Sequence, residues 1–292
     1  MKKTLLILLF VLMVFPLISQ NETSVEKSYV KINLKYSSDY VFMGRTDSLA
    51  APYLSPSISY YHKSGFYTRG SLSYLTTADQ NRIDLSIVSL GYDATSKNLY
   101  GGIGLSAYFF NQESYAVPSS LFGFLDAYLG YDFYWFEINT DLSLGMSDNM
   151  DVFTGIEVFR IFYLFDSKLL ITPSFYTNAA TQNYYNEYYN TRNSKMTLGG
   201  GFTKGKGANG NINNVNNVQE SVTLEEASKF QVLDYEFSNS ATYRLKNWRI
   251  NATAKFFIPV NASTVTADGE TVYEEELNNV FFYSFGIGYI IK

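Results

Sequence analysis

The feature that most constrains this chain is a series of twelve stretches in which apolar and polar residues alternate. The connections between these stretches are alternately long and short. The clearest stretch covers residues 136–146, with one face made of Phe136, Ile138, Thr140, Leu142, Leu144 and Met146. A strand with one apolar face over about ten residues suits a wall that has lipid on one side and water on the other. The pattern predicts a transmembrane β-barrel.

The predicted strands cover residues 29–43 or part of that range, 54–62, 66–76, 83–92, 99–110, 121–134, 136–146, 152–165, 169–176, 230–245, 248–258 and 280–291. In the fourth strand, Ile83, Leu85 and Ile87 are expected on the lipid face. Arg160 falls on an apolar face, against the pattern. Short periplasmic turns and long external loops are typical of outer-membrane barrels, whereas a secreted β-sandwich has no reason to separate its loops by length. We therefore expect an all-β, antiparallel, up-and-down barrel.

The number of strands depends on residues 178–228. Met196, Leu198 and Phe202 alternate there and favour an additional hairpin, which would give fourteen strands. In contrast, Ile212 and Val215 belong to a three-residue repeat, which cannot give a strand one lipid face. We expect twelve strands, with a long external loop near 178–228.

The start of the chain predicts export. Lys2 and Lys3 precede an apolar run at residues 5–15, which is shorter than the roughly 20 residues that a membrane-spanning helix needs. Residues 1–19 therefore resemble a cleavable signal peptide, and residues 20–292 would form the barrel. The expected location is the outer membrane of a Gram-negative cell.

Composition supports a membrane barrel and limits its partners. Aromatic residues make up 17% of the chain, with 26 Tyr and 23 Phe, and the formal net charge is -5. Tyr is enriched where hydrocarbon meets water, and nucleic acid would require a basic surface. We expect outer-membrane lipid, the barrel-assembly machinery and small solutes or ions as partners, and no nucleic acid.

Three motifs could carry chemistry, and each has a simpler interpretation. His62 and Ser64 have the H-x-S spacing of barrel enzymes that deacylate lipid A, but they lie in a tight turn. The acidic run 274–276 could attract calcium, although a charge run on a loop is usually solvated. The glycine-rich tract 199–210 lacks the ending of a phosphate-binding loop. The sequence predicts no catalytic, cofactor or metal site, and a protein that is not an enzyme.

The polar faces suggest a pore. Alternation places eight charged residues inside the barrel as candidate pore-lining groups: Arg69, Asp84, Asp126, Glu137, Asp141, Glu157, Arg249 and Lys255. The five acids and three bases predict a negative interior and a preference for cations. Alternatively, these charges pair across the lumen and plug a narrow barrel.

Two segments resemble a known family. Residues 38–44 (SDYVFMG) and 59–67 (SYYHKSGFY) are similar to the opening hairpin of the TorF family of porin-like barrels. Residues 230–238, 258–261 and 281–289 resemble the C-terminal half of related outer-membrane barrels. The resemblance implies a barrel and a pore, and it supplies no catalytic or binding residues. The leading prediction is a porin or small-solute channel that works by passive diffusion. The alternatives are a structural or ligand-binding barrel that uses its long external loops and, third, a lipid-modifying enzyme.

Overall fold

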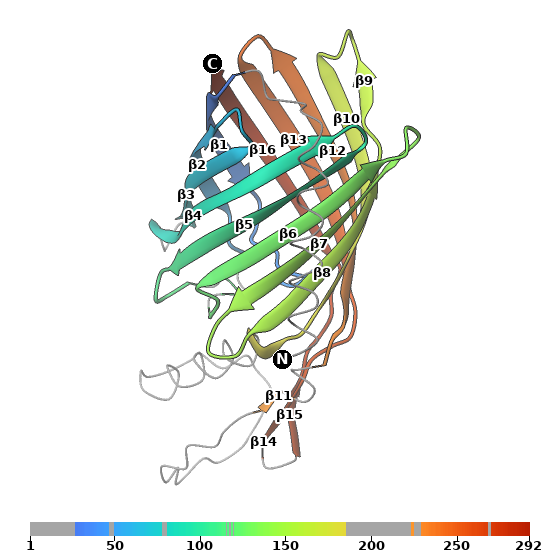
Figure 1. The fold of residues 1–292 in the computed structure, drawn as a ribbon. Coiled ribbons are helices and arrows are strands. Elements are labelled where there is room, and N and C mark those ends of the chain that lie inside the picture. The colour runs from blue at the N-terminus through green and yellow to red at the C-terminus, as the bar shows by residue number, and fades with distance from the viewer. Residues whose placement is uncertain are drawn as a thin grey trace.

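The computed structural model describes residues 27–46, 50–77, 81–114, 116, 118, 120–184, 223–224, 229–267 and 270–292. These residues form a closed antiparallel β-barrel (Figure 1). The expected signal peptide, the glycine-rich tract and most of the expected 178–228 loop lie outside the described residues. No helix among the described residues is long and apolar enough to cross a membrane.

Twelve strands form the wall, and each pairs with its two neighbours. They are β1 (Tyr29–Ser37), β2 (Tyr53–Tyr61), β3 (Phe66–Thr76), β4 (Asn81–Ser96), β5 (Leu99–Phe110), β6 (Gly123–Asp132), β7 (Glu137–Met146), β8 (Asp151–Phe159), β10 (Leu169–Ala180), β12 (Gln231–Leu245), β13 (Trp248–Pro259) and β16 (Val280–Ile291). The first and last strands, β1 and β16, pair with each other. Because β10 also pairs directly with β12, no hairpin can lie between them in the wall. The prediction of twelve strands is confirmed.

The outer surface of the wall is apolar and the inner surface is largely polar. On β3, Leu72 is exposed on the outside, while its neighbours Ser71 and Ser73 line an internal cavity. Ile58 and Ile287 are likewise exposed on the outside. Exposed apolar area of this extent is unfavourable in water but suits hydrocarbon. The fold is therefore that of a transmembrane barrel.

The two rims of the barrel differ. The tight turns at 62–65, 97–98, 165–168 and 246–247 lie at one end, together with the start of β1 and the end of β16. We call this end the short-turn rim. The opposite end, the long-loop rim, carries a small separate sheet of β11 (Thr223–Leu224), β14 (Thr264–Ala267) and β15 (Glu270–Glu274), seen at the bottom of Figure 1. The predicted separation of short and long connections is present.

The prediction that Ile83, Leu85 and Ile87 of the fourth strand all face lipid is wrong for two of the three residues. Ile83 is exposed on the outside as expected, but Leu85 is buried and Ile87 lines the internal cavity. The register of β3 against β4 shifts between Ser73 and Tyr74. A bulge adds one residue on one strand, and a slip of one residue moves all the following side chains to the other face. Simple alternation could not detect that shift.

Arg160 interrupts the predicted strand 152–165. β8 ends at Phe159, and a separate short strand, β9 (Phe162–Leu164), pairs with the beginning of β10. The Arg160 guanidinium donates hydrogen bonds to the backbone carbonyls of Tyr134 (3.1 Å) and Trp135 at the short-turn rim. It also lies 5.4 Å from the centre of the Phe162 ring. These contacts satisfy an arginine that would otherwise be costly on an apolar face.

Candidate functional site

The segment after β1 folds into the barrel instead of continuing the strand. The sequence predicts a first strand over all or part of 29–43, and β1 covers the first part of that range, ending at Ser37. Met43 and Gly44 have positive φ angles of 51° and 72°, and Phe42 and Arg45 bridge the turn that they make. An extended strand cannot continue through two left-handed residues. We call residues 38–46 the inward segment.

The inward segment packs against the far wall of the barrel. The Phe42 ring lies 5.6 Å from the Phe153 ring of β8 and 5.3 Å from the Tyr184 ring, measured between centroids. Around these rings is a lumenal apolar cluster, which is fully buried and consists of Leu121, Phe124, Phe153, Ala180, Tyr184 and Leu233. This cluster fills the lumen toward the long-loop rim.

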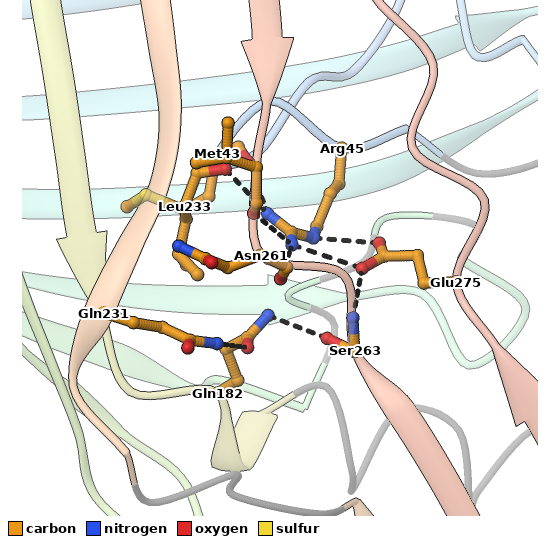
Figure 2. A network of polar contacts seen from close by, with 9 residues as sticks. Met43, Arg45, Gln182, Gln231, Leu233, Asn261, Ser263 and Glu275 are labelled. Atoms are coloured by element: carbon orange, nitrogen blue, oxygen red, sulfur yellow. Dashed lines mark hydrogen bonds and ion pairs between the residues drawn. The ribbon is translucent and has the colours of Figure 1, made fainter. Parts of the chain in front are cut away.

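Arg45 fastens the inward segment through a buried polar network (Figure 2). Its side chain is only 3% exposed, and Nε and Nη2 donate to the two oxygens of Glu275, at 2.9 and 3.2 Å. The guanidinium also donates to the backbone carbonyls of Leu233 (3.2 Å) and Asn261 (3.1 Å). Two-pronged pairing of Arg with a carboxylate is strong and geometrically specific. The network ties the first loop to β12 and to the last long connection.

Glu275 corrects the interpretation of the acidic run 274–276 as simply solvated. Its side chain is 8% exposed, and besides Arg45 it accepts the backbone amide of Ser263 at 3.0 Å. Glu276, in contrast, is exposed. The Ser263 hydroxyl in turn accepts a hydrogen bond from Gln182 (3.0 Å), and Gln231 donates to Gln182 (3.1 Å). Sequence alone could not separate Glu275 from its neighbours, because its partner lies 230 residues away.

Between the inward segment and the short-turn rim the lumen is hollow. A cavity of about 410 Å³ lies against β1, β2 and β3, within the range of about 300–1,000 Å³ that is typical of small-molecule sites. Its lining is mainly basic and hydroxylated, and includes Lys31, Lys35, Ser55, Ser57, Ser59, Arg69, Ser71 and Ser73. Residues of the inward segment, among them Tyr40, complete the lining on one side.

Two of the eight predicted pore-lining residues form ion pairs, and a third lies at the short-turn rim. Lys255 pairs with Glu236 (2.8 Å), and Asp84 is fully buried and accepts from Arg82 (3.0 Å). Arg249 donates to the carbonyls of Lys246 and Trp248 at the short-turn rim. Sequence reasoning did not predict the partners in the two ion pairs, Glu236 and Arg82, as pore-lining residues, although alternation places both on the inward face of their strands.

Asp126, Glu137, Asp141 and Glu157 lie on the neighbouring strands β6, β7 and β8, and we call this set the acidic wall. Asp141 accepts a hydrogen bond from the Tyr176 hydroxyl at 2.6 Å. By strand order, β7 is opposite β1 in the barrel. The eighth residue, Arg69 of β3, lines the cavity together with Lys31 and Lys35 of β1. The acidic wall thus lies across the lumen from the lysines of β1.

Sequence reasoning missed Lys31 and Lys35. The signal that could have found them is the alternation of β1, where Ile32 and Leu34 are exposed on the outside and the two lysines occupy the other face. Asp93 was missed in the same way, because β4 continues to Ser96, beyond the predicted end of that strand. Its carboxylate accepts a hydrogen bond from Tyr128 at 2.9 Å.

The Tyr176 side chain reaches Asp141 by lying across Gly155, where an added Cβ would collide with the ring. We expect Gly155→Val to displace Tyr176 and to destabilise the barrel by about 1–3 kcal/mol. The midpoint of urea unfolding, followed by fluorescence, measures this loss. Gly70→Val is the matched control because a Cβ at Gly70 meets nothing within 4 Å. Equal midpoints for the two variants would show that this tyrosine contact does not stabilise the barrel.

His62 and Ser64 lie in the β2–β3 turn at the short-turn rim, outside the cavity lining. The Nδ1 atom of His62 is 2.7 Å from the Ser64 hydroxyl, and this contact is exposed. The ring also lies near that of Tyr60, with centroids 6.4 Å apart. The turn therefore holds the histidine and serine of the H-x-S motif together, but at a distance from the hollow interior.

Comparisons with known proteins agree with the fold only in broad terms. No family model matches the chain, and no curated protein matches it. Among solved structures it is similar to a KdgM porin, at 9% identity and a TM-score of 0.45, covering 89% of this chain and 98% of that one. It is also similar to LpxR from Salmonella typhimurium, at 9% identity and a TM-score of 0.43, covering 89% and 99%. These values carry no argument about function, and the assignment to the class of transmembrane β-barrels rests on the strand pairing.

Proposed function

We propose that this protein is an outer-membrane channel through which small polar solutes diffuse passively, related to the TorF-like porins. The observation that carries the proposal is the hollow polar interior. Lys35 and Arg69 point into the barrel, line its cavity and are nevertheless exposed. Charged side chains inside a barrel can remain solvated only where water has room. A water-filled interior is the first requirement of a pore.

The arrangement of charge supports the same function. The acidic wall on β6, β7 and β8 lies across the barrel from the lysines of β1. Fixed charges that line a narrow channel concentrate counter-ions and orient polar solutes. We therefore propose the acidic wall, together with Lys31, Lys35 and Arg69, as the pore-lining groups, with Arg249 at the short-turn rim. Asp84 and Lys255 would act mainly through their ion pairs.

The inward segment determines how wide the channel is. Its Phe42 packs into the lumenal apolar cluster, so solute passage requires this segment to shift or to leave a narrow path beside it. The filled end is also the one observation that favours the second candidate, a ligand-binding barrel that does not conduct. The two functions differ in whether current flows across a bilayer.

Arg45→Ala tests the channel. Removing one partner of a buried ion pair costs about 3–5 kcal/mol. This cost destabilises the packed conformation of the inward segment, because Arg45 fastens that segment to Glu275 and to neighbouring carbonyls. The segment should then leave the lumen more often. We expect several-fold higher mean conductance than the wild type in planar bilayers. Lys63→Ala, at an exposed residue of the turn 62–65, is the control and should conduct like the wild type. If the wild type and Arg45→Ala both fold and neither carries current, the result would favour the ligand-binding barrel.

A further inference from the structure

We propose that the cavity between the inward segment and the short-turn rim is a binding site for small hydroxylated anions, the class that includes sugar acids and sugar phosphates. Lys31, Lys35 and Arg69 would bind the anionic group, and the serine hydroxyls with Asn33 would bind the hydroxyl groups. The inference requires only the folded barrel, and it stands whether or not the barrel conducts.

The cavity is lined by three cations, two of them lysines of β1. Among the described residues, no ion pair involves Lys31, Lys35 or Arg69. The hydrogen bonds of the Arg69 side chain go to neutral oxygens, the Ser59 hydroxyl at 3.2 Å and the Tyr61 hydroxyl at 3.0 Å. A group of like charges on one wall of a lumen raises the local concentration of anions.

Neighbouring charges compensate Arg69 in part but leave the lysines of β1 positive. Asp93 of β4 is close enough to attract Arg69, whereas Lys255 of β13, itself paired with Glu236, repels Lys35. The carboxylate in the cavity lining is Asp39, whose Oδ1 accepts the backbone amides of Tyr40 (2.7 Å) and Ala51 (2.8 Å). These bonds commit the carboxylate to holding the inward segment in place. An incoming anion would therefore lower the electrostatic energy of this wall.

The rest of the lining suits hydroxyl groups. Five serines from β2 and β3 face the cavity, and each hydroxyl both donates and accepts. Asn33 adds a buried Oδ1 that lacks a hydrogen-bond partner within the described part of the chain. This oxygen can only accept, so it does not bind an anion, but it can bind a ligand hydroxyl. Cations beside hydroxyl-binding groups favour an anion that carries hydroxyls over a simple ion.

Isothermal titration calorimetry of the full folded chain in detergent micelles tests the proposal. Glucuronate and glucose 6-phosphate are the anionic probes, and they distinguish a carboxylate from a phosphate preference. Glucose is the neutral probe. We expect at least one anionic probe to bind and glucose to bind much more weakly. Charge-assisted contacts are strong, so Lys31→Gln with Lys35→Gln should weaken binding by about tenfold or more.

The matched control is Lys63→Gln with Lys168→Gln, which removes two exposed lysines from turns at the short-turn rim. It should bind like the wild type. Arg69→Gln serves as a second test if the double lysine variant does not show the heat-modifiable gel migration of a folded barrel. Glucose that binds as tightly as the anions, no binding of either anion, or unchanged binding by the folded lysine and arginine variants would each overturn the proposal. Binding without conductance would leave this site intact and reject the channel.

Discussion

Leu72→Arg is expected to prevent stable insertion of the barrel, whereas Ser71→Arg is expected to leave it folded. The two residues are adjacent in the middle of β3 and point in opposite directions. Leu72 is exposed on the outer surface, and Ser71 lines the cavity. An arginine that faces lipid near the midplane of the bilayer costs about 2–4 kcal/mol, while the same side chain inside meets water. Such a cost is a large part of the stability of a typical domain.

Heat-modifiable gel migration of both variants, after refolding into lipid vesicles, measures the difference. The folded fraction should fall sharply for Leu72→Arg and stay near that of the wild type for Ser71→Arg. The pair is well matched, because the same charge is added at the same depth in the same strand. Equal folding of the two variants would mean that the outer surface of β3 does not face lipid.

Neutralising the acidic wall should reverse the ion selectivity of the proposed channel. Among the described residues that face the lumen between the lumenal apolar cluster and the short-turn rim, and apart from the ion pairs described above, the acids are Asp39, Asp93, Asp126, Asp132, Glu137, Asp141 and Glu157, and the bases are Lys31, Lys35, Arg69, Arg244 and Arg249. Seven acids against five bases leave two negative charges in excess, so the wild type should prefer cations. The combined variant Asp126→Asn, Asp141→Asn and Glu157→Gln removes three negative charges and leaves an excess of one positive charge. It should prefer anions weakly.

The reversal potential under a salt gradient measures this change of sign. The difference between the proteins should shrink at high salt, since the Debye length falls from about 10 Å at 0.1 M to about 3 Å at 1 M. Asp166→Asn is the control, because Asp166 is exposed in the turn 165–168 at the short-turn rim. A combined variant that conducts but stays cation-selective would show that the acidic wall does not govern permeation.

The wall of the barrel was predictable because lipid imposes one rule on every strand. The twelve predicted strands all exist, and even the interrupted β8 and β9 fall inside one of them. A residue that faces hydrocarbon must be apolar whatever its neighbours are, so the signal is local. The rule failed where the backbone changed register, as at the bulge in β4, which turned Leu85 and Ile87 inward.

The interior was less predictable because its contacts join distant parts of the chain. Leu121, Phe153 and Leu233 are apolar residues that face inward, and no periodicity distinguishes them from residues that face lipid. The inward segment reads as a strand, since Val41, Phe42 and Met43 suit one, and only the left-handed turn at Met43 and Gly44 directs it inward. The Arg45 and Glu275 pair depends on that turn. Six of the eight predicted pore-lining residues remain proposed pore-lining groups, but the charge pattern of the lumen also needed Lys31 and Lys35.

The pairing of β1 with β16 has a consequence for how the protein is made. Val30 is the register partner of Ile291, so the first strand must wait until the last strand has been synthesised before it gains its second neighbour. Until then the growing sheet has two open edges, which can pair with any other unprotected strand. Contacts between residues this far apart in the sequence also form slowly. Closure of the ring by β1 and β16 therefore protects both edges in a single step.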